Sequence, residues 1–278
     1  MDKKIYAFIA MALLLFANLA FGQKQFKTVK AVATRTPVID GKFIDEEWIY
    51  GGLATEFIQV EPKEGVPASE KTEAYFLYDK ENLYVGVKCF DSEPDKIMSE
   101  ISGRDNEGAS DFIALAFDTF NDDRNGYFFG TTPDGTKIDG KIFNDGETDG
   151  SWDGVWYVET ARTDYGWIAE FRIPFTTFTF PEKEVNTWGM NILRQIERKK
   201  EESFWQEVTR DDGFKVSNFG NLEDIRGIKP GMNLQLLPYL TSGAKKDRVS
   251  PLTNNNQNGF TGLDIRYGLT SNLGGGIK

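Results

Sequence analysis

The chain has 278 residues, of which 40% are hydrophobic and 27% charged, a balance typical of one large or two modest globular domains. It has no histidine and one cysteine, so histidine-based catalysis, HExxH zinc sites and intrachain disulfides are excluded. The formal net charge of −11 argues against nucleic acid and anionic lipid surfaces as partners.

The first predicted element is an export signal at residues 1–22. Lys3 and Lys4 form a short basic region, residues 5–21 are almost entirely apolar, and small side chains precede Gln23. This pattern predicts a secretory signal peptide that is cut before Gln23. The alternative is an uncleaved membrane anchor, for which residues 5–21 lie at the lower length limit.

Short stretches of alternating apolar and polar residues fill the next 200 or so positions, a pattern typical of β-strands. Strands are expected, in chain order, at residues 75–78, 83–90, 111–118, 126–132, 155–162, 167–173 and 187–194. One face of the 83–90 strand collects Leu83, Val85, Val87 and Cys89. A single helical turn is expected at 45–48. Many short strands with regular turns predict an all-β sandwich, with Cys89 in its core.

The charge of the chain changes sharply after residue 228. Residues 23–228 are strongly acidic, whereas residues 229–278 carry more Lys and Arg than Asp and Glu. Such a break predicts a domain boundary close to 228–231. We therefore expect three parts: a signal peptide at 1–22, a sandwich at 23–228 and a separate C-terminal part at 229–278.

Several stretches of residues 36–224, in order along the chain, resemble the family 9 carbohydrate-binding module. They are Val38-Ile39-Asp40-Gly41-Lys42 with Asp45-Glu46-Glu47-Trp48, Tyr78-Asp79-Lys80-Glu81-Asn82-Leu83-Tyr84-Val85, 110–118, Trp167-Ile168-Ala169-Glu170 with Ile173-Pro174, and Phe219-Gly220-Asn221-Leu222. The resemblance implies an immunoglobulin-like β-sandwich that holds structural calcium and binds the ends of sugar chains.

The residues after the expected boundary resemble the start of an outer-membrane β-barrel that follows such modules in Bacteroidetes-type surface proteins. The stretches are Gly227-Ile228-Lys229-Pro230-Gly231 and Leu236-Leu237-Pro238-Tyr239. Residues 263–270 alternate between apolar and polar, as a strand between lipid and a wet lumen would; an ordinary soluble strand is the alternative. We expect these to be the first strands of an incomplete barrel in a longer protein, exported to the outer membrane or periplasm.

The sugar-contacting positions of the family differ in this chain. Aligned without gaps, the two stacking tryptophans of sugar-binding members correspond to Gly108 and Gly213. The polar partners correspond to Ala114, Phe128 and Leu193. The alignment therefore predicts that the family's stacking pair and its polar partners are missing.

Other residues could replace them. Trp152 and Trp156 flank a loop rich in glycine and aspartate, and Trp205 lies near the end of the domain. Their rings could stack on a sugar, with Arg104 as a replacement hydrogen-bond donor. The alternative is that these aromatic residues pack inward, as is expected for Trp48, Trp167 and Trp188.

Four aspartates are candidate ligands for a structural calcium ion. Asp91 and Asp111 match acidic positions of the family's motifs, and Asp118 and Asp122 crowd one turn. Calcium prefers several such oxygen ligands, although the spacing is not that of an EF-hand. The alternative is that the acidic loops only keep the surface soluble.

Three functions remain open. The first is a non-catalytic module that binds polysaccharide or oligosaccharide and serves polysaccharide capture and catabolism at the outer membrane. The second is a structural or plug-like interaction module that has lost sugar binding. The third is a protein associated with hydrolysis of O-glycosyl bonds, but no stretch resembles a hydrolase motif, so we expect binding rather than catalysis.

Overall fold

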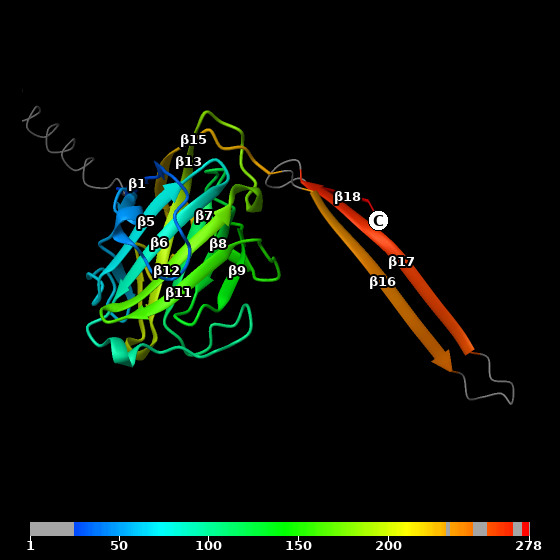
Figure 1. The fold of residues 1–278 in the computed structure, drawn as a ribbon, viewed down its shortest axis with the longest axis horizontal. Coiled ribbons are helices and arrows are strands. Elements are labelled where there is room, and N and C mark those ends of the chain that lie inside the picture. The colour runs from blue at the N-terminus through cyan, green and yellow to red at the C-terminus, as the bar shows by residue number, and fades with distance from the viewer. Residues whose placement is uncertain (1–24, 232–233, 247–254, 269–273, 278) are drawn as a thin grey trace, which may run out of the picture.

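The computed structural model describes residues 25–231, 234–246, 255–268 and 274–277. Within residues 25–231, two β-sheets pack face to face around one main apolar core (Figure 1). The predicted all-β sandwich is therefore confirmed.

The larger sheet has nine strands in the described part of the chain, arranged as β1-β15-β13-β7-β8-β9-β10, with β14 paired to β13 and β4 paired to β14. Its strands are β1 (Thr28–Lys30), β4 (Ile58–Glu61), β7 (Phe112–Asp118), β8 (Gly126–Thr131), β9 (Lys137–Phe143), β10 (Glu147–Asp149), β13 (Val185–Ile196), β14 (Glu201–Phe204) and β15 (Gly220–Arg226). β14 folds back antiparallel to the end of β13 and pairs with β4. These two short strands form a wall along one edge of the larger sheet.

The smaller sheet has six strands among residues 25–231, in the order β11-β12-β6-β5-β2 with β3 on β5. Its strands are β2 (Val32–Ala33), β3 (Gly52–Ala54), β5 (Thr72–Tyr78), β6 (Asn82–Phe90), β11 (Tyr157–Thr163) and β12 (Gly166–Pro174). The short helices are α2 (Asp45–Trp48), η1 (Pro94–Lys96), η2 (Phe175–Thr177), η3 (Glu197–Lys199) and η4 (Val216–Asn218). The helical turn expected at 45–48 is confirmed.

Period-two alternation decides which side chains fill the space between the sheets. On β6 the buried face is the predicted one, and burial raises the pKa of Cys89 to about 12. On β7 the core side chains are Ile113, Leu115 and Phe117. Because neighbours on a strand point to opposite faces, the alternate residues Phe112, Ala114 and Ala116 lie on the outer face of the larger sheet.

Aromatic rings make up much of the core. Trp188 contacts the rings of Phe117, Phe175, Phe178 and Phe180, with centroid separations from 5.1 to 6.3 Å. The three tryptophans predicted to be buried, Trp48, Trp167 and Trp188, are fully buried.

Strand β9 is one that the alternation pattern did not predict. Its centre holds Asp139 and Gly140, which rarely occupy strand interiors. In the structure Asp139 is buried and accepts hydrogen bonds from Arg104 and Gly154. Gly140 lies opposite Phe128 of β8 and leaves space for its ring. Both residues therefore stabilise neighbouring segments, by hydrogen bonds from Asp139 and by ring packing over Gly140, and do not favour the strand itself.

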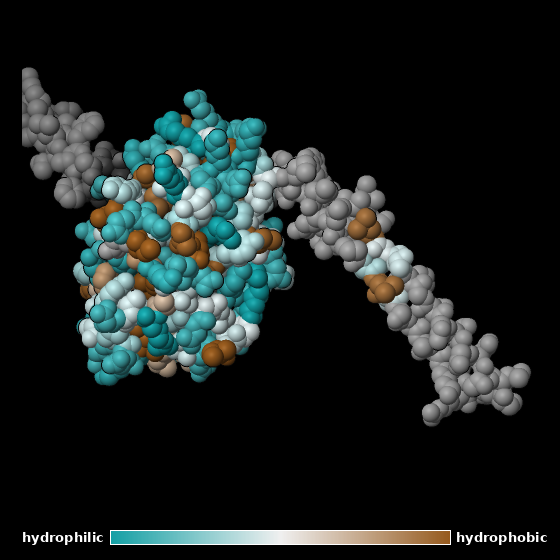
Figure 2. All heavy atoms as spheres, viewed as in Figure 1, coloured by the Kyte–Doolittle hydropathy of each residue, from teal (hydrophilic) through white to brown (hydrophobic). Residues whose placement is uncertain are grey.

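A separate antiparallel sheet holds β16 (Leu234–Lys246), β17 (Asn255–Gly268) and β18 (Gly274–Ile277). The strand expected at 263–270 coincides with the end of β17, while its last two residues lie outside the described residues, as does the whole signal predicted at 1–22. Whether these strands belong to a barrel stays a prediction. No helix in the described ranges is long and apolar enough to span a membrane. Figure 2 shows a mostly hydrophilic sandwich surface with scattered hydrophobic residues.

Candidate functional site

The outer face of the larger sheet holds an open pocket of about 560 Å³. Such a volume suits a small ligand or one end of a chain. The lining residues come from β4, β7, β8, β9, β10, β13, β14 and two loops: Val60, Glu61, Glu107, Phe112, Ala114, Phe128, Ile138, Thr148, Leu193, Glu202, Phe204, Arg210, Gly213 and Phe214. The pocket is thus assembled from segments that are far apart in the sequence.

The floor of the pocket follows one row of cross-strand neighbours. Leu193 of β13 lies opposite Ala114 of β7, which lies opposite Gly130 of β8, which lies opposite Ile138 of β9. The two central positions have the smallest side chains, but the ring of Phe112 occupies the space over Gly130. The hollow therefore lies over Ala114, which lines the pocket.

Two phenylalanine rings cover glycines on this face. A Cβ atom added to Gly130 would overlap the ring of Phe112, and one added to Gly140 would lie 2.5 Å from Phe128 Cε1. Both rings therefore lie close against the sheet backbone, which only glycine permits at these positions. Phe128 is partly exposed and offers apolar ring area to a ligand in the pocket, whereas Phe112 is 5% exposed and mainly fills the floor.

The row of floor residues continues into an apolar wall, because Phe204 of β14 lies beside Leu193 in the register. Phe204 of β14 and Phe214 of the following loop have ring centroids 5.8 Å apart, and Val60 of β4 packs in the same small cluster. This wall exists because β14 turns back along β13 and brings β4 with it.

Three glutamates and one arginine supply the charges that line the pocket. Arg210 is held by Glu61, with Nε 2.5 Å from Oε1 and Nη2 2.9 Å from Oε2, and Nη2 also donates to the carbonyls of Val60 and Pro62. Glu107 and Glu202 have no side-chain hydrogen bond or ion pair within the described part of the chain. The pocket therefore combines an apolar interior with two unpaired carboxylates.

Burial and neighbouring carboxylates raise the pKa values of both unpaired glutamates. Desolvation raises the pKa of Glu107, which lies exposed beside the pocket, and the charges of Glu202 and Glu197 raise it further. Desolvation also raises the pKa of Glu202, which is half-buried, and the charge of Glu61 adds to this effect. Both sites are thus unfavourable for a second negative charge and favourable for a positive one.

None of the predicted ligand-binding residues lines this pocket. Trp156 and Trp205 are 1% and 3% exposed, so neither offers a ring face to a sugar, which corrects the idea that they form a stacking surface. Trp152 is half-buried and packs on Tyr127 and Phe129, with centroids 5.2 and 6.1 Å away. The loop that carries Trp152 and Trp156 folds inward because their rings complete the main core.

Arg104 is engaged elsewhere. Its Nη2 lies 2.5 Å from the buried Oδ1 of Asp139 and its Nε lies 2.7 Å from Asp153 Oδ1. Nη2 also donates to the carbonyl of Gly154. These contacts fasten the 150–156 loop to β9, so Arg104 has a structural task and its role in ligand binding stays a prediction.

The positions that align with the family's sugar contacts do lie at the pocket. Ala114, Phe128, Leu193 and Gly213 line it, and Gly108 adjoins Glu107. The sequence alignment therefore named four residues that line the pocket, but the lining residues Phe112 and Glu202 were missed. For Phe112, its position on the outward-facing side of the strand 111–118 was the one sequence signal that could have indicated a place in the pocket.

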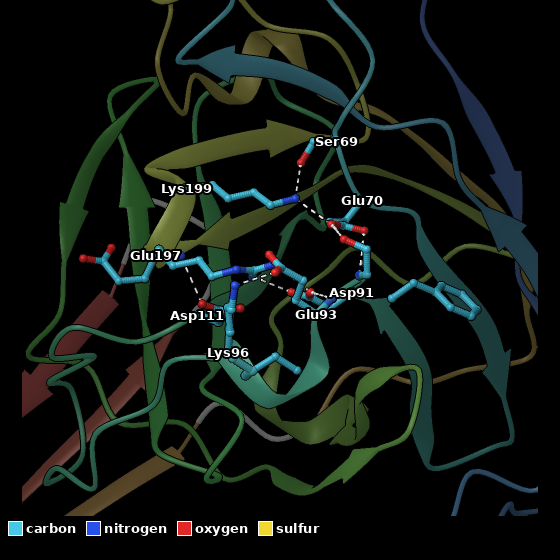
Figure 3. Close-up of polar contacts among 12 residues, drawn as sticks. Ser69, Glu70, Asp91, Glu93, Lys96, Asp111, Glu197 and Lys199 are labelled. Carbon is cyan, nitrogen blue, oxygen red and sulfur yellow. Dashed lines mark hydrogen bonds and ion pairs between the residues drawn. The ribbon is translucent and has the colours of Figure 1, made fainter.

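Asp91 and Asp111 lie in a network of charged groups at the end of the sandwich (Figure 3). Arg198 donates to both oxygens of Asp91 at 2.6 and 2.7 Å, and Asp91 is buried. Burial by itself raises the pKa of Asp91, but the hydrogen bonds and charge of Arg198 outweigh it and hold this pKa below its ordinary value. The guanidinium of Arg198 therefore occupies both Asp91 oxygens, which a calcium ion would otherwise bind.

The remaining metal candidates do not complete a site. Asp111 accepts a hydrogen bond from the Glu197 N–H, and its second oxygen is buried without a partner. Asp118 and Asp122 accept backbone N–H groups within their own turn, and desolvation raises the pKa of Asp118 to about 6. In the described ranges no three acidic or other metal-binding side chains converge. The four aspartates thus do not fit one calcium ion.

We expect calcium to leave the stability of the sandwich unchanged, because Arg198 already neutralises Asp91. The check is the melting temperature of the purified protein after treatment with EGTA and again with millimolar CaCl₂. A rise that calcium produces and EGTA reverses would contradict this expectation and support the calcium implied by the family resemblance.

We compared the chain and its fold with known proteins. No protein-family model matches the chain, and a search of curated proteins finds no match. Among solved structures, a family 9 carbohydrate-binding module from Caldicellulosiruptor kristjanssonii in complex with cellotriose matches with a TM-score of 0.53 and 17% identity, over 73% of this chain and 94% of that one. The fold is that of a family 9 carbohydrate-binding module.

Two further structures agree with this fold. The glucose complex of a Caldicellulosiruptor kristjanssonii family 9 module matches with a TM-score of 0.52 and 17% identity, over 73% of this chain and 96% of that one. A proposed carbohydrate-binding protein from Bacteroides uniformis matches with a TM-score of 0.60 and 10% identity, over 74% of this chain and all of that one. At 10–17% identity this likeness concerns the fold.

The motifs that resemble the family hold this CBM9-like sandwich together. Glu170 of the late strand accepts the N–H groups of Asp40 and Gly41 at 3.0 and 2.8 Å, and the Trp48 Nε1–H at 3.2 Å. In the strand-turn-strand motif, Asp79 accepts two backbone N–H groups of its turn and the Tyr84 hydroxyl. These residues therefore have structural roles in the sandwich.

Proposed function

We propose that the CBM9-like sandwich is a non-catalytic carbohydrate-binding module that takes one end of a glycan into the pocket on its outer sheet face. The observation that carries this proposal is the partly exposed ring of Phe128, which lies against Gly140 and lines the pocket together with Phe112. The C–H face of a sugar ring packs well on such a surface, and the opening is wide enough for the rest of a chain to extend outward.

The fold comparison supports the same proposal. Two of the matching structures are complexes with cellotriose and glucose, and a third is a proposed carbohydrate-binding protein. In this chain, positions that align with the family's sugar contacts line the pocket, but with apolar side chains in place of polar ones. By this alignment, the pocket lies where the family resemblance predicts the sugar contacts, and its lining is more apolar than the resemblance implies.

Glycan binding is tested by affinity electrophoresis and calorimetry of the purified protein against xylan, cellulose, mannan and chitosan fractions. We expect binding to at least one of them, and Phe128→Ala to weaken it about tenfold or more through loss of ring contact. Tyr50→Ala is the control, since Tyr50 is 75% exposed and does not line the pocket. A folded protein that binds no glycan would favour the structural or plug-like module instead.

We further propose that the module is exported and serves polysaccharide capture at the outer membrane, as part of a longer protein with a C-terminal barrel. This rests on the predicted signal at 1–22 and on the antiparallel strands β16, β17 and β18. Cell fractionation of the native protein and N-terminal sequencing of its mature form check it. A mature chain that starts at Gln23 in the outer-membrane fraction is the expected result.

A further inference from the structure

The charges around the pocket point to the kind of ligand that it accepts. Glu202 projects from β14 next to the apolar wall, and Glu107 comes from the 101–110 loop on the same side of the sheet. Each feels the negative charge of the other or of a further glutamate, and neither has a side-chain partner among the described residues. A ligand that brings a positive charge to this edge would remove that repulsion.

The positive charge that lines the pocket, on Arg210, is already paired with a carboxylate. Arg210 is paired with Glu61 through two nitrogens and caps the carbonyls of Val60 and Pro62. An anionic sugar would therefore meet two unpaired carboxylates and no free cation in the pocket lining. This arrangement disfavours acidic sugars and leaves neutral and cationic ones.

We propose that the pocket selects glycans whose terminal residues carry a protonated amine, that is, 2-amino-2-deoxy sugars that are not acetylated. This rests on the proposed function, since the sugar ring must pack on Phe128 in the pocket that Glu107 and Glu202 also line. Glu202 contributes more than Glu107, because it is half-buried whereas the exposed Glu107 is screened by water.

The proposal has a pH signature. The amine binds the ionised carboxylates, so affinity rises with pH through the range in which Glu107 and Glu202 lose their protons. Their pKa values are raised, so this range lies above the ordinary glutamate value. The charged groups that face them are Glu61 and Arg210 beside Glu202, and Glu197 and Glu202 beside Glu107.

The test uses three β-1,4-linked trisaccharides that differ only at C2: cellotriose with a hydroxyl, the glucosamine trimer with an ammonium and the N-acetylglucosamine trimer with a neutral amide. Calorimetry with the purified protein near pH 6.5 is expected to give about tenfold or more tighter binding of the glucosamine trimer, as for a hydrogen bond to a charged group. In Glu107→Gln/Glu202→Gln this preference is expected to disappear while cellotriose binding is retained.

A matched control separates a local effect from the acidity of the whole protein. Glu182→Gln/Glu184→Gln changes the net charge equally on an exposed loop before β13, and it is expected to keep the preference. Circular dichroism of each variant confirms folding. Glu107 and Glu202 form no side-chain hydrogen bond within the described part of the chain, and Glu182 and Glu184 are exposed, so neither pair of substitutions should lower the melting temperature.

The outcomes distinguish the two proposals. Equal or tighter binding of cellotriose would overturn the amine preference and leave the carbohydrate-binding function standing. A preference that survives Glu107→Gln/Glu202→Gln would also overturn it, because the charge would then act from elsewhere. Binding of none of the three trisaccharides, nor of any longer glycan, would overturn both proposals.

Discussion

Replacing Arg198 with methionine is expected to destabilise the sandwich by about 3–5 kcal/mol, because it leaves the buried Asp91 carboxylate without its counter-charge. Methionine keeps much of the apolar side chain, so the loss of stability measures the contribution of the guanidinium group. Urea unfolding at pH 7 measures it. Since the pKa of Asp91 is lowered in the folded state, the difference from the unaltered protein should shrink as pH falls and Asp91 takes up a proton.

Two further variants define the cause of this loss. Lys96→Met removes an exposed ion pair with Glu93 in the same network and is expected to cost less than about 1 kcal/mol. Asp91→Leu combined with Arg198→Met removes both buried charges and should recover part of the stability. If Arg198→Met alone lowers the free energy of unfolding no more than Lys96→Met does, the buried Asp91 carboxylate does not depend on Arg198 and the explanation is wrong.

The second large effect is expected at Glu170. Glu170→Leu removes the acceptor for the N–H groups of Asp40 and Gly41 and for the indole of Trp48, all of which lie at the covered face of β12. Leaving these donors unpaired should lower the free energy of unfolding by about 3 kcal/mol or more. Chemical denaturation followed by tryptophan fluorescence measures this loss.

The neighbouring strand supplies the control for Glu170. Glu159 of β11 lies directly opposite Glu170 but is exposed and has no side-chain partner in the described part of the chain, so Glu159→Leu should change stability little. Glu170→Gln keeps one acceptor oxygen and should fall between the two. Equal effects of Glu159→Leu and Glu170→Leu would show that the three N–H groups find other partners.

The sheets and their buried faces were largely predictable. On β6 the alternation from Leu83 to Cys89 identified the core face correctly, and Trp48, Trp167 and Trp188 were placed correctly in the interior. Such patterns are local, because each strand must bury every second side chain whatever its neighbours are. Strand β9 escaped for the opposite reason: Asp139 and Gly140 serve Arg104 and Phe128, which lie elsewhere in the sequence.

The candidate site was predictable only in outline. The family alignment pointed to Ala114, Phe128, Leu193 and Gly213, and all four line the pocket. The search for replacement aromatic residues led instead to Trp152, Trp156 and Trp205, because an aromatic side chain in a loop looks alike in sequence whether it turns inward or outward. The structure turns Trp156 and Trp205 into the core, where the apolar area that they bury outweighs any exposed role.

The sequence alone determined a two-layered β domain, the faces of its main strands and the absence of histidine chemistry, since these follow from composition and from spacing along the chain. Only the tertiary structure decided what the acidic residues do. Arg198 reaches Asp91 across 107 positions of sequence, and the pocket joins residues of β4, β7, β8, β9, β10, β13, β14 and two loops. The pairing of charges and the depth of a hollow depend on distances between segments, which no local pattern encodes.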